Sequence, residues 1–507
     1  MWWNQTTRQL PLLGALCLAA CTGADPNQDT SGSGGTGTAG SGGQVDVGGS
    51  PAADPFEAQA DTSEGLVNVS ANLEELLEKG TLAGACDAYW AGDPSDRKAM
   101  LLCGKSMFFY ESYGTVGVPT ILPEMLLTDF EDIVGPGFSK LGMIQDPYSE
   151  KKLPLGLAKG APFGNLESVA FTCASCHFGQ LPDGRYAVGA ANHNYEYGKH
   201  NLMMAVFPLI ALLGGEANHD PEAIKVIQPL IDKVNNTPGL KLSLTTKLLP
   251  LASAGGQTPQ FPKEAEHYYA TWKSGTMDFL IEPLPLNDTV HTVSKISALW
   301  GVPSDAEAEK AGMIHAMLGF TGGTKSLTRF AQEFVTFGGG DGTPWTVEKV
   351  RPLVEYIESL RAPQNPNAPN VTLAKQGEAL FAEQGCITCH SGPRGSGLDL
   401  YSYEEIGTDS AMKYWLDPTL SGEPCCNAPA PPDEKPTHQL KSPRLVGFWA
   451  MKRFLHNGSV DSVEALLCKN GPRGTITEPA LGDGGHTYGC DLDDSSKDAL
   501  IAYLLSH

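Results

Sequence analysis

The sequence predicts a mainly α-helical protein with long loops, built from two modules in series, of which the first is much the larger. Apolar residues recur at helical spacing in VEKVRPLVEYIESL (347–360) and again in SSKDALIAYLLSH (495–507). Each of these predicted helices closes a segment that contains one CxxCH motif. The 58 glycines and 37 prolines among 507 residues predict long loops between the helices.

The two predicted helices also resemble each other, which indicates an internal repeat. Aligning Leu353 with Leu500 brings a tyrosine and a serine of each helix into register. The Pro- and Asn-rich stretch 362–370 lies between the two segments. We therefore expect a first module at 66–361, enlarged by insertions, and a second module at 371–507.

The amino terminus predicts export. Residues 1–20 hold one charged residue, followed by the apolar run LPLLGALCLAA, which is too short to span a bilayer and is typical of a signal peptide. The run ends at Leu-Ala-Ala-Cys21, which resembles the lipobox of bacterial lipoproteins. We expect residues 1–20 to be removed and Cys21 to be lipidated; an ordinary secretory signal is the alternative.

Residues 21–65 are expected to form a flexible tether. SGSGGTGTAGSGG (31–43) is built from small and polar residues, which cannot bury enough apolar surface to fold. A lipidated cysteine followed by such a tether would hold the folded body outside the cytoplasm, in the periplasm or at the outer membrane or cell surface. Contact with a membrane is expected only through this lipid.

The composition excludes one large class of function. Lys and Arg number 35 against 58 Asp and Glu, which gives a formal net charge of −23 at pH 7. Nucleic-acid binding needs a basic face, so this charge argues against it and fits a basic or neutral partner. Twelve cysteines are many for a reducing cytosol, which agrees with export.

The motifs CASCH (173–177) and CITCH (386–390) carry the chemistry. Two thiols one helical turn apart can add to the two vinyl groups of a haem, and the following His can bind the iron. Paired zinc ligands rarely carry a His directly after each pair, and a redox CxxC needs none. We therefore expect two covalently bound c-type haems. The residues expected to hold them are Cys173, Cys176 and His177 in the first motif and Cys386, Cys389 and His390 in the second.

The segment KSPRLVGFWAMKRFLHNGSV (441–460) offers further ligands for the second haem. His456 is the favoured second iron ligand and Met451 the alternative; a core Met and a His bonded to backbone in an Asn-Gly turn are the structural interpretations. Two strong ligands would make this haem an electron-transfer centre. Arg444 is a candidate partner of a haem propionate, or else a surface Arg.

For the first haem, the segment NDTVHTVSKISALWG (287–301) holds the leading candidates. His291 is the first choice on the distal side, with a solvated loop His as the alternative. Trp300 could relay electrons or host a radical between the haems, although a core Trp is the commoner role. Phe320 could shield the distal pocket. Weaker candidates of the same kind are His193, His200, His267 and His315.

The other cysteines are expected to be structural. Cys86 and Cys103 lie close in sequence and are expected to pair. Four further cysteines allow three pairings; because neighbouring cysteines rarely bond each other, each of the first two is expected to join one of the last two. These four are Cys425, Cys426, Cys468 and Cys490. The tract DLDDSSKD (491–498) could bind Ca²⁺, but a solvated helix N-terminus is favoured.

At these residues the sequence resembles the bacterial di-haem cytochrome c peroxidase superfamily, over roughly residues 160–507. The resemblance lies in the two CxxCH motifs, KISALWG, EALFAEQGCITCHSGP, IGTD and SPRLVGFWAMKRFLHNGSV. The superfamily includes peroxidases, the di-haem enzyme that matures methylamine dehydrogenase, and the rubber oxygenases. The long first segment and the FLHNGS run look more like the rubber oxygenases. The resemblance then implies one five-coordinate, reactive haem and one six-coordinate haem.

One departure limits this resemblance. The peroxidases carry a tryptophan–aspartate–glycine run after the counterpart of KISALWG, whereas MLGFTGGTKSL (317–327) stands there in this sequence. The distal catalytic residues of the peroxidases are therefore not carried over.

The sequence as a whole predicts an exported di-haem c-type cytochrome that acts as an oxidoreductase. The first haem would react with peroxide or dioxygen, and the second would exchange electrons with a small redox protein, a cytochrome or a cupredoxin. The alternatives are a pure electron-transfer di-haem cytochrome without catalytic activity and a tethered haem protein in a surface respiratory complex. The first segment is far larger than an electron carrier needs, which favours the enzyme.

Overall fold

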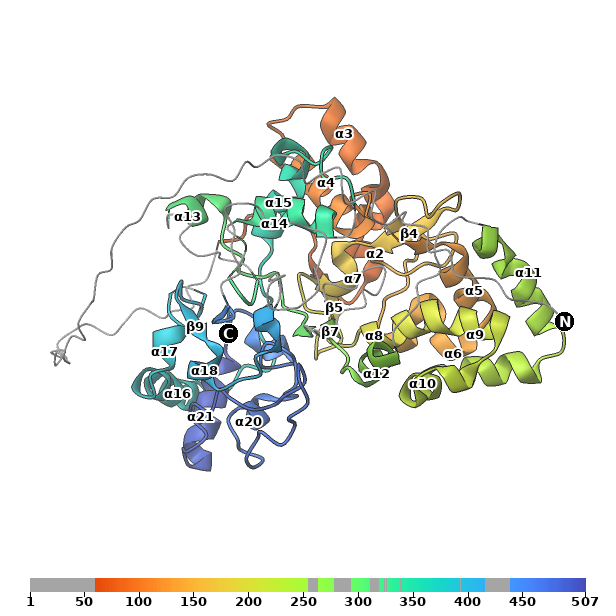
Figure 1. The fold of residues 1–507 in the computed structure, drawn as a ribbon. Coiled ribbons are helices and arrows are strands. Elements are labelled where there is room, and N and C mark those ends of the chain that lie inside the picture. The colour runs from red at the N-terminus through yellow and green to blue at the C-terminus, as the bar shows by residue number, and fades with distance from the viewer. Residues whose placement is uncertain are drawn as a thin grey trace, which may run out of the picture. The chain divides into compact units, whose positions relative to one another are not determined.

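The computed structural model describes residues 60–253, 263–277, 293–310, 319–337, 340–414 and 438–507, except the single positions Val116, Gly323, Lys325 and Pro393. All of these belong to one compact unit, residues 54–507. The fold is mainly helical, as predicted, with few and short strands (Figure 1). The signal segment 1–20, Cys21 and most of the tether lie outside the described residues, and the module boundary at 362–370 stays a prediction.

The helices fall into three stretches of the chain. Up to the first CxxCH motif they are α2 (Leu73–Leu76), η1 (Glu78–Gly84), α3 (Ala85–Ala91), α4 (Arg97–Tyr110), α5 (Ile121–Asp129), α6 (Glu131–Val134), η2 (Pro136–Leu141) and α7 (Cys173–His177). The next are α8 (Tyr197–Asn201), η3 (Leu202–Val206), α9 (Phe207–Leu213), η4 (Glu216–Asn218), α10 (Pro221–Asn236), α11 (Leu240–Ser253), α12 (Lys263–Thr271), α13 (Asp305–Lys310), α14 (Leu327–Phe337) and α15 (Val347–Ser359). The last are α16 (Val371–Glu383), α17 (Cys386–Cys389), α18 (Tyr403–Ile406), η6 (Ala411–Tyr414), η7 (Phe448–Ala450), α20 (Val463–Leu466) and α21 (Asp494–Leu504).

The described strands form small antiparallel sheets. Their order is β1 (Val69–Ser70), β6 (Tyr186–Val188), β5 (Phe178–Gln180) in one sheet and β2 (Val118–Pro119), β4 (Ser168–Phe171), β3 (Leu157–Lys159) in another. Two further pairs are β7 (Thr276–Met277) with β8 (Ser294–Lys295), and β9 (Leu400–Ser402) with β10 (Gln439–Lys441). Because β4 leads into α7 and β5 follows it, the first CxxCH motif is held between two sheets.

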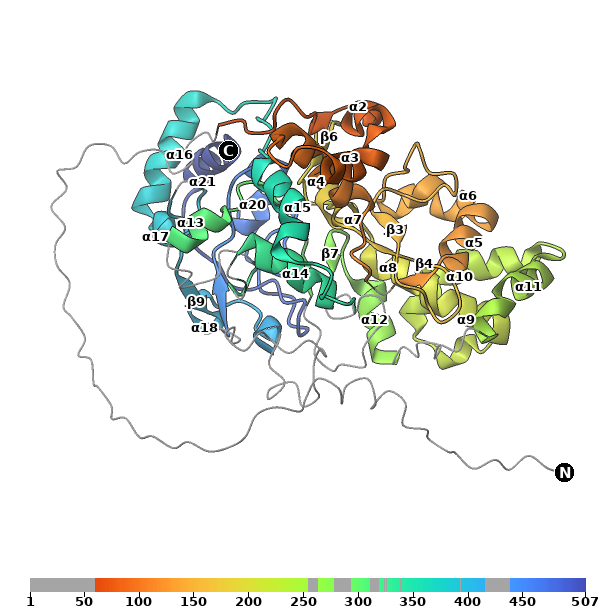
Figure 2. The same cartoon turned by 90° about the horizontal axis from the view of Figure 1, so that it is seen from above.

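The predicted repeat appears as two matching helix pairs. Helix α4 packs against α15, and α16 packs against α21 (Figures 1 and 2). In each pair a glycine of the first helix meets a carbonyl oxygen and a tyrosine Cβ of the second, at positions that correspond in the alignment of the two helices. The residues are Gly104 with Pro352 and Tyr356 in one pair, and Gly377 with Ala499 and Tyr503 in the other. The periodicity prediction for 347–360 and 495–507 is confirmed by α15 and α21.

The hydrophobic core divides along similar lines. One cluster is built from the last stretch of the chain only, with Phe381, Phe448, Phe454 and Leu500 among its buried members. Two larger clusters draw mainly on residues 66–360. None of the helices in the described part of the chain has both the length and the hydropathy that a bilayer-spanning segment requires.

Candidate haem-binding sites

The first CxxCH motif forms the short helix α7. Thr172 caps it, because its hydroxyl accepts a hydrogen bond from the Ala174 N–H at 3.3 Å and donates to the Phe109 carbonyl at 3.1 Å. The Nδ1 atom of His177 lies 2.9 Å from the carbonyl oxygen of Ser297 and donates to it. Nε2 is therefore the nitrogen with a free lone pair, as in a metal-ligating His oriented by a backbone carbonyl. Burial lowers the pKa of His177 to about 4, so the ring is neutral at pH 7.

The cysteines of this motif are not set up for disulfide exchange. Neither Cys173 nor Cys176 is disulfide-bonded to another described cysteine. Burial raises the pKa of Cys173 to about 12, whereas a redox-active CxxC thiol needs a lowered pKa. The Sγ atom of Cys176 lies 3.7 Å from the Sδ atom of Met277, so a thioether already borders the attachment point.

His177 faces a cavity whose walls are largely apolar. The empty volume of this cavity, including space that is open to solvent, is about 1250 Å³. Among the described lining residues, His177 is the only histidine. The side chains that matter most below are Met277, Lys295, Trp300, Phe320, Arg444 and Met451.

The second motif repeats this arrangement on a different scaffold. Helix α17 follows α16 after Gly385, whose φ of 73° is a left-handed conformation that favours glycine. The Nδ1 atom of His390 lies 2.9 Å from the carbonyl oxygen of Gly395 and donates to it, so Nε2 again keeps its lone pair. Burial lowers the pKa of His390 and raises that of Cys386.

A second cavity lies in front of His390. The empty volume of this cavity, including space that is open to solvent, is about 1400 Å³. Both cysteines of the motif line it, as do Met451 and His456, so the structure brings both candidate ligands to the second site. A third histidine, His486, also lines this cavity. Sequence reasoning missed His486; its place in the Gly-rich run GDGGHTYGC before the last helix was the available signal.

The two cavities share a wall that is rich in cations. Lys295, Lys441 and Arg444 line both cavities, together with Phe320 and Met451. No described carboxylate forms an ion pair with any of the three cations. Burial lowers the pKa of Lys295 and of Lys441 to about 8 and that of Arg444 to about 10. Buried cations without counter-charges fit an anionic group such as haem propionates.

Arg444 is not the solvated surface residue that was the alternative to a propionate partner. Its Nε donates to the Trp300 carbonyl at 3.1 Å and its Nη2 to the Ala298 carbonyl at 2.8 Å. Trp300 is buried, donates its indole N–H to the Val188 carbonyl at 2.9 Å, and lines the first cavity. It is therefore both a core Trp and a wall residue. Phe320 lines both cavities, which fits the shielding role predicted for it.

Three of the other histidine candidates are described, and none of these three lines either cavity. The Nδ1 atom of His200 lies 2.7 Å from the Tyr195 hydroxyl, and His267 pairs with Asp220 at 3.5 Å. Both ring nitrogens of His193 are buried without a hydrogen-bond partner among the described residues, yet its ring lines neither cavity. The leading distal candidate His291 and the weaker candidate His315 lie outside the described residues.

The disulfides correct one expectation and confirm another. Cys86 pairs with Cys103, as predicted. Cys468 pairs with Cys490, so the prediction that each would join Cys425 or Cys426 is wrong; those two lie outside the described residues. The rule against bonds between neighbouring cysteines excluded Cys468–Cys490 only on the premise that all four cysteines pair among themselves. The approach of residues 468 and 490 is a tertiary feature that the sequence does not show.

The acidic tract 491–498 forms the start of α21. The Asp493 carboxylate caps this helix by accepting a hydrogen bond from the Ser496 N–H at 3.0 Å, as the helix N-terminus interpretation expects. Among the described residues, no group of three or more His, Cys, Asp or Glu is arranged to hold a metal ion.

Comparisons with known proteins add little to this geometry. No protein-family model matches the sequence, and no curated protein matches it. Among solved structures, a chain of hydrazine synthase from Kuenenia stuttgartiensis is 15% identical with a TM-score of 0.29, over 48% of this chain and 79% of that chain. A MauG-like protein associated with microbial copper homeostasis is 13% identical with a TM-score of 0.28, over 43% of this chain and 75% of that chain. At such TM-scores the argument for function rests on the residues themselves.

Proposed function

We propose that this protein is a di-haem c-type cytochrome that acts as an oxidoreductase outside the cytoplasm. The observation that carries the proposal is the duplicated arrangement of the two motifs. In each, the His donates Nδ1–H to a backbone carbonyl at 2.9 Å and faces a large cavity with its other nitrogen available. Such orientation of a His is what a metal ligand needs.

The surroundings of the motifs support haem as the group that they hold. Haem supplies one-electron transfer and the activation of dioxygen or peroxide when it is bound. The apolar walls would exclude water from the macrocycle, and Lys295, Lys441 and Arg444 would pair with its carboxylates. Disulfides Cys86–Cys103 and Cys468–Cys490 fit the oxidising compartment in which c-type attachment takes place.

The two sites differ in a way that supports different roles. The described wall of the first cavity holds no histidine besides His177, which suits a site where an exogenous ligand binds. The second cavity holds two histidines besides His390, which suits a six-coordinate electron-transfer centre. We therefore assign peroxide or dioxygen chemistry to the first site and electron relay to the second. Phe320 and Met451, in the shared wall, lie between them.

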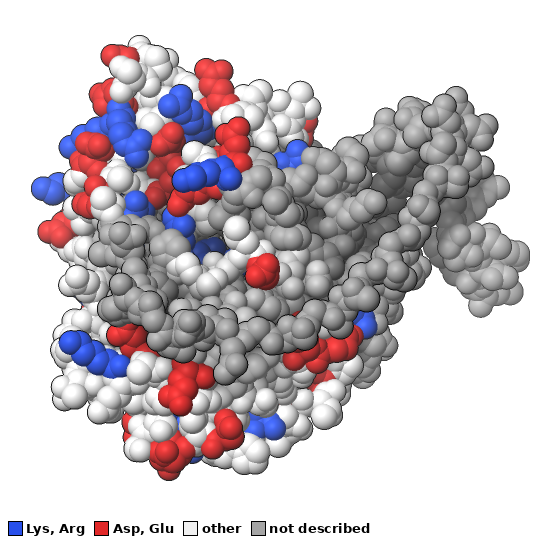
Figure 3. Space-filling model, turned by 90° about the vertical axis from the view of Figure 1, so that its left-hand side faces the viewer, with Lys and Arg blue, Asp and Glu red and all other residues white. Residues whose placement is uncertain are grey.

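The proposed setting follows from the amino terminus and the charge. Lipid on Cys21 would tether the body to a membrane, and a small cytochrome or cupredoxin would exchange electrons with it. On the face shown in Figure 3, acidic side chains are interspersed with basic ones, and it is the formal net charge of −23 that favours a basic or neutral partner over a nucleic acid. Mass spectrometry of the mature amino terminus tests the lipid.

The central test is the haem content and spin state of matured protein. The pyridine haemochrome assay should give two haems per chain, and replacing both cysteines of either motif by Ala should leave one. The matched control is the Cys86→Ala/Cys103→Ala variant, which also loses two cysteines but should keep both haems. One haem or none in the parent protein would refute the proposal.

Spin state then separates enzyme from carrier. Electron paramagnetic resonance of the ferric protein should show one high-spin haem, and peroxide or an exogenous ligand should alter it. If both haems are low-spin and indifferent to peroxide, the catalytic role is wrong and the protein is an electron-transfer cytochrome.

A further inference from the structure

Two histidine rings face each other in the second cavity at a spacing that suits a metal between them. The ring centres of His390 and His486 lie 6.3 Å apart, with the ring planes at 72° to each other. Both residues line the same cavity. An edge-to-face ring pair has this spacing, and so do two imidazoles with a metal in the gap between them.

The gap has the length of two coordination bonds. A metal–imidazole nitrogen bond is about 2 Å long, and the nitrogen lies about 1 Å from the centre of its ring. Two imidazoles on opposite sides of one metal therefore have ring centres about 6 Å apart. Among the described residues, His486 is the one whose ring meets this condition with respect to His390.

The ring of His486 packs edge-on against Tyr488, with ring centres 5.3 Å apart, but this contact leaves one ring nitrogen unsatisfied. Its Nδ1 atom is buried and finds no hydrogen-bond partner among the described residues, which is costly unless something else satisfies the ring. A buried imidazole nitrogen without a hydrogen-bond partner is available as a metal ligand.

Two hydrogen bonds hold the main chain of His486 in the position that places its ring beside His390. Its N–H donates to the Ile406 carbonyl at 2.9 Å, and its own carbonyl accepts from Arg473 Nη2 at 2.8 Å. Its φ of 47° is a left-handed conformation, which a residue other than glycine keeps only when its surroundings hold it there. Arg473 and His486 both lie within the loop closed by the Cys468–Cys490 disulfide.

The ring of His456 also contacts a tyrosine, but it is not among the described rings that contact His390. It packs edge-on against Tyr403, with ring centres 6.0 Å apart and planes at 81°. The carbonyl of His456 accepts from the Lys295 N–H at 2.8 Å, which joins it to the shared wall. The backbone of His456 therefore helps to hold Lys295 in the wall that the two cavities share.

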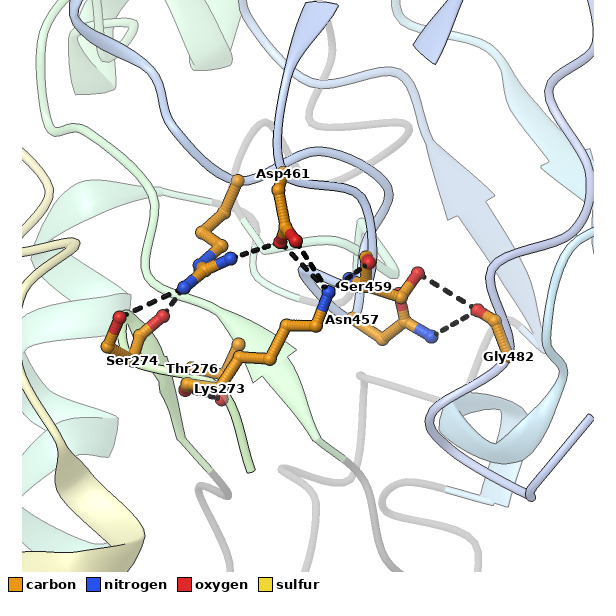
Figure 4. Close-up of polar contacts among 8 residues, drawn as sticks. Lys273, Ser274, Thr276, Asn457, Ser459, Asp461 and Gly482 are labelled. Carbon is orange, nitrogen blue, oxygen red and sulfur yellow. Dashed lines mark hydrogen bonds and ion pairs between the residues drawn. The ribbon is translucent and has the colours of Figure 1, made fainter. Parts of the chain in front are cut away.

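The loop that carries His456 also braces the one that carries His486. Asn457 Nδ2 donates to the Gly482 carbonyl at 2.9 Å, and the Ser459 hydroxyl donates to the same oxygen at 3.0 Å (Figure 4). On its other side this loop is tied to the first module, since Lys273 reaches both Ser459 and Asp461 (Figure 4). The two loops that carry His456 and His486 are therefore joined by hydrogen bonds, although we assign the two histidines different roles.

We infer that His486, and not His456, is the second axial ligand of the metal centre whose first ligand is His390. This inference rests on the proposed function, because it needs a haem at the second motif. It assigns His456 a positioning role.

The test uses the full-length, matured protein and reads spin state rather than activity. In His486→Ala, one low-spin ferric signal should become high-spin, and added imidazole should restore it. The matched control His456→Ala should keep the low-spin signal. The pyridine haemochrome assay is run on every sample: two haems per chain in the parent show that the proposed function holds, whatever the ligand.

A second variant keeps the test decisive if the His486→Ala protein cannot be obtained in sufficient yield. In His486→Met the thioether would replace the imidazole, so the haem should stay low-spin while its electron paramagnetic resonance changes and its reduction potential rises. The inference is overturned if two haems are present and both His486 variants keep the parent signal. It is also overturned if His456→Ala alone becomes high-spin, or if no low-spin haem exists in the parent protein.

Discussion

His177 donates its Nδ1 hydrogen to the carbonyl oxygen of Ser297 across 2.9 Å. The acceptor belongs to the segment 295–301, which also supplies Lys295 to the wall of both cavities. The carbonyls of Ala298 and Trp300 in the same segment accept both hydrogen bonds of Arg444. One stretch of chain therefore orients His177, the proposed iron ligand, and anchors the cation Arg444 in the shared wall.

Gly377→Ala should destabilise the protein by about 1–3 kcal/mol, the usual cost of overpacking. A Cβ at this position would lie 2.7 Å from the Tyr503 Cβ and still closer to the Ala499 carbonyl, so α16 and α21 would have to move apart. Urea denaturation measures the change. Gly84→Ala is the control, because a Cβ there meets nothing within 4 Å. Equal stability of the two variants would contradict the close helix contact.

Replacing Cys468 and Cys490 together by Ala should cost about 3 kcal/mol, since the bond closes a loop with a sequence separation of 22. The change should also broaden or shift the low-spin signal of the second haem, because His486 lies in this loop. The Cys86→Ala/Cys103→Ala variant is matched, with a separation of 17. It should lose similar stability but leave that signal unchanged. An identical spectral effect in both variants would show that general loosening, not the loop, is responsible.

What the sequence could predict was local. The CxxCH motifs need only consecutive residues, and α15 and α21 follow from periodicity within each helix. The His390–His486 approach depends on a Gly-rich loop without periodic pattern, so no local signal ranked His486 above His456. The shared wall likewise joins Lys295 to Lys441, which are far apart in the chain. Such pairings arise only when residues far apart in the chain are brought together by the fold.

Glu358 should make stability depend on pH. Burial is the main cause that raises its pKa to about 7, and the nearby carboxylates add to it. Because this pKa exceeds the ordinary value of 4.5, the folded state binds more protons between about pH 4.5 and 7, so stability falls as pH rises through that window. Glu358→Gln keeps an acceptor for the Asp305 N–H and should remove this decline.

Denaturant titrations at several pH values check this prediction. The unfolding free energy of Glu358→Gln relative to the parent should rise from pH 4.5 to pH 7. Glu348→Gln, at the exposed start of the same helix, is the control and should track the parent. Parallel curves for all three proteins would mean that Glu358 is not the group responsible.

Arg444→Gln should lower the reduction potentials of the two proposed haems. Although burial lowers the pKa of Arg444 to about 10, the guanidinium stays charged at pH 7, and a cation favours the reduced, less positive iron. At an effective dielectric constant of about 20, the loss is on the order of 1 kcal/mol, or some tens of millivolts, at each site. Redox titration measures it, with the exposed Arg351→Gln as control. Because Arg444 lines both cavities, a shift confined to one haem would contradict a shared cationic wall.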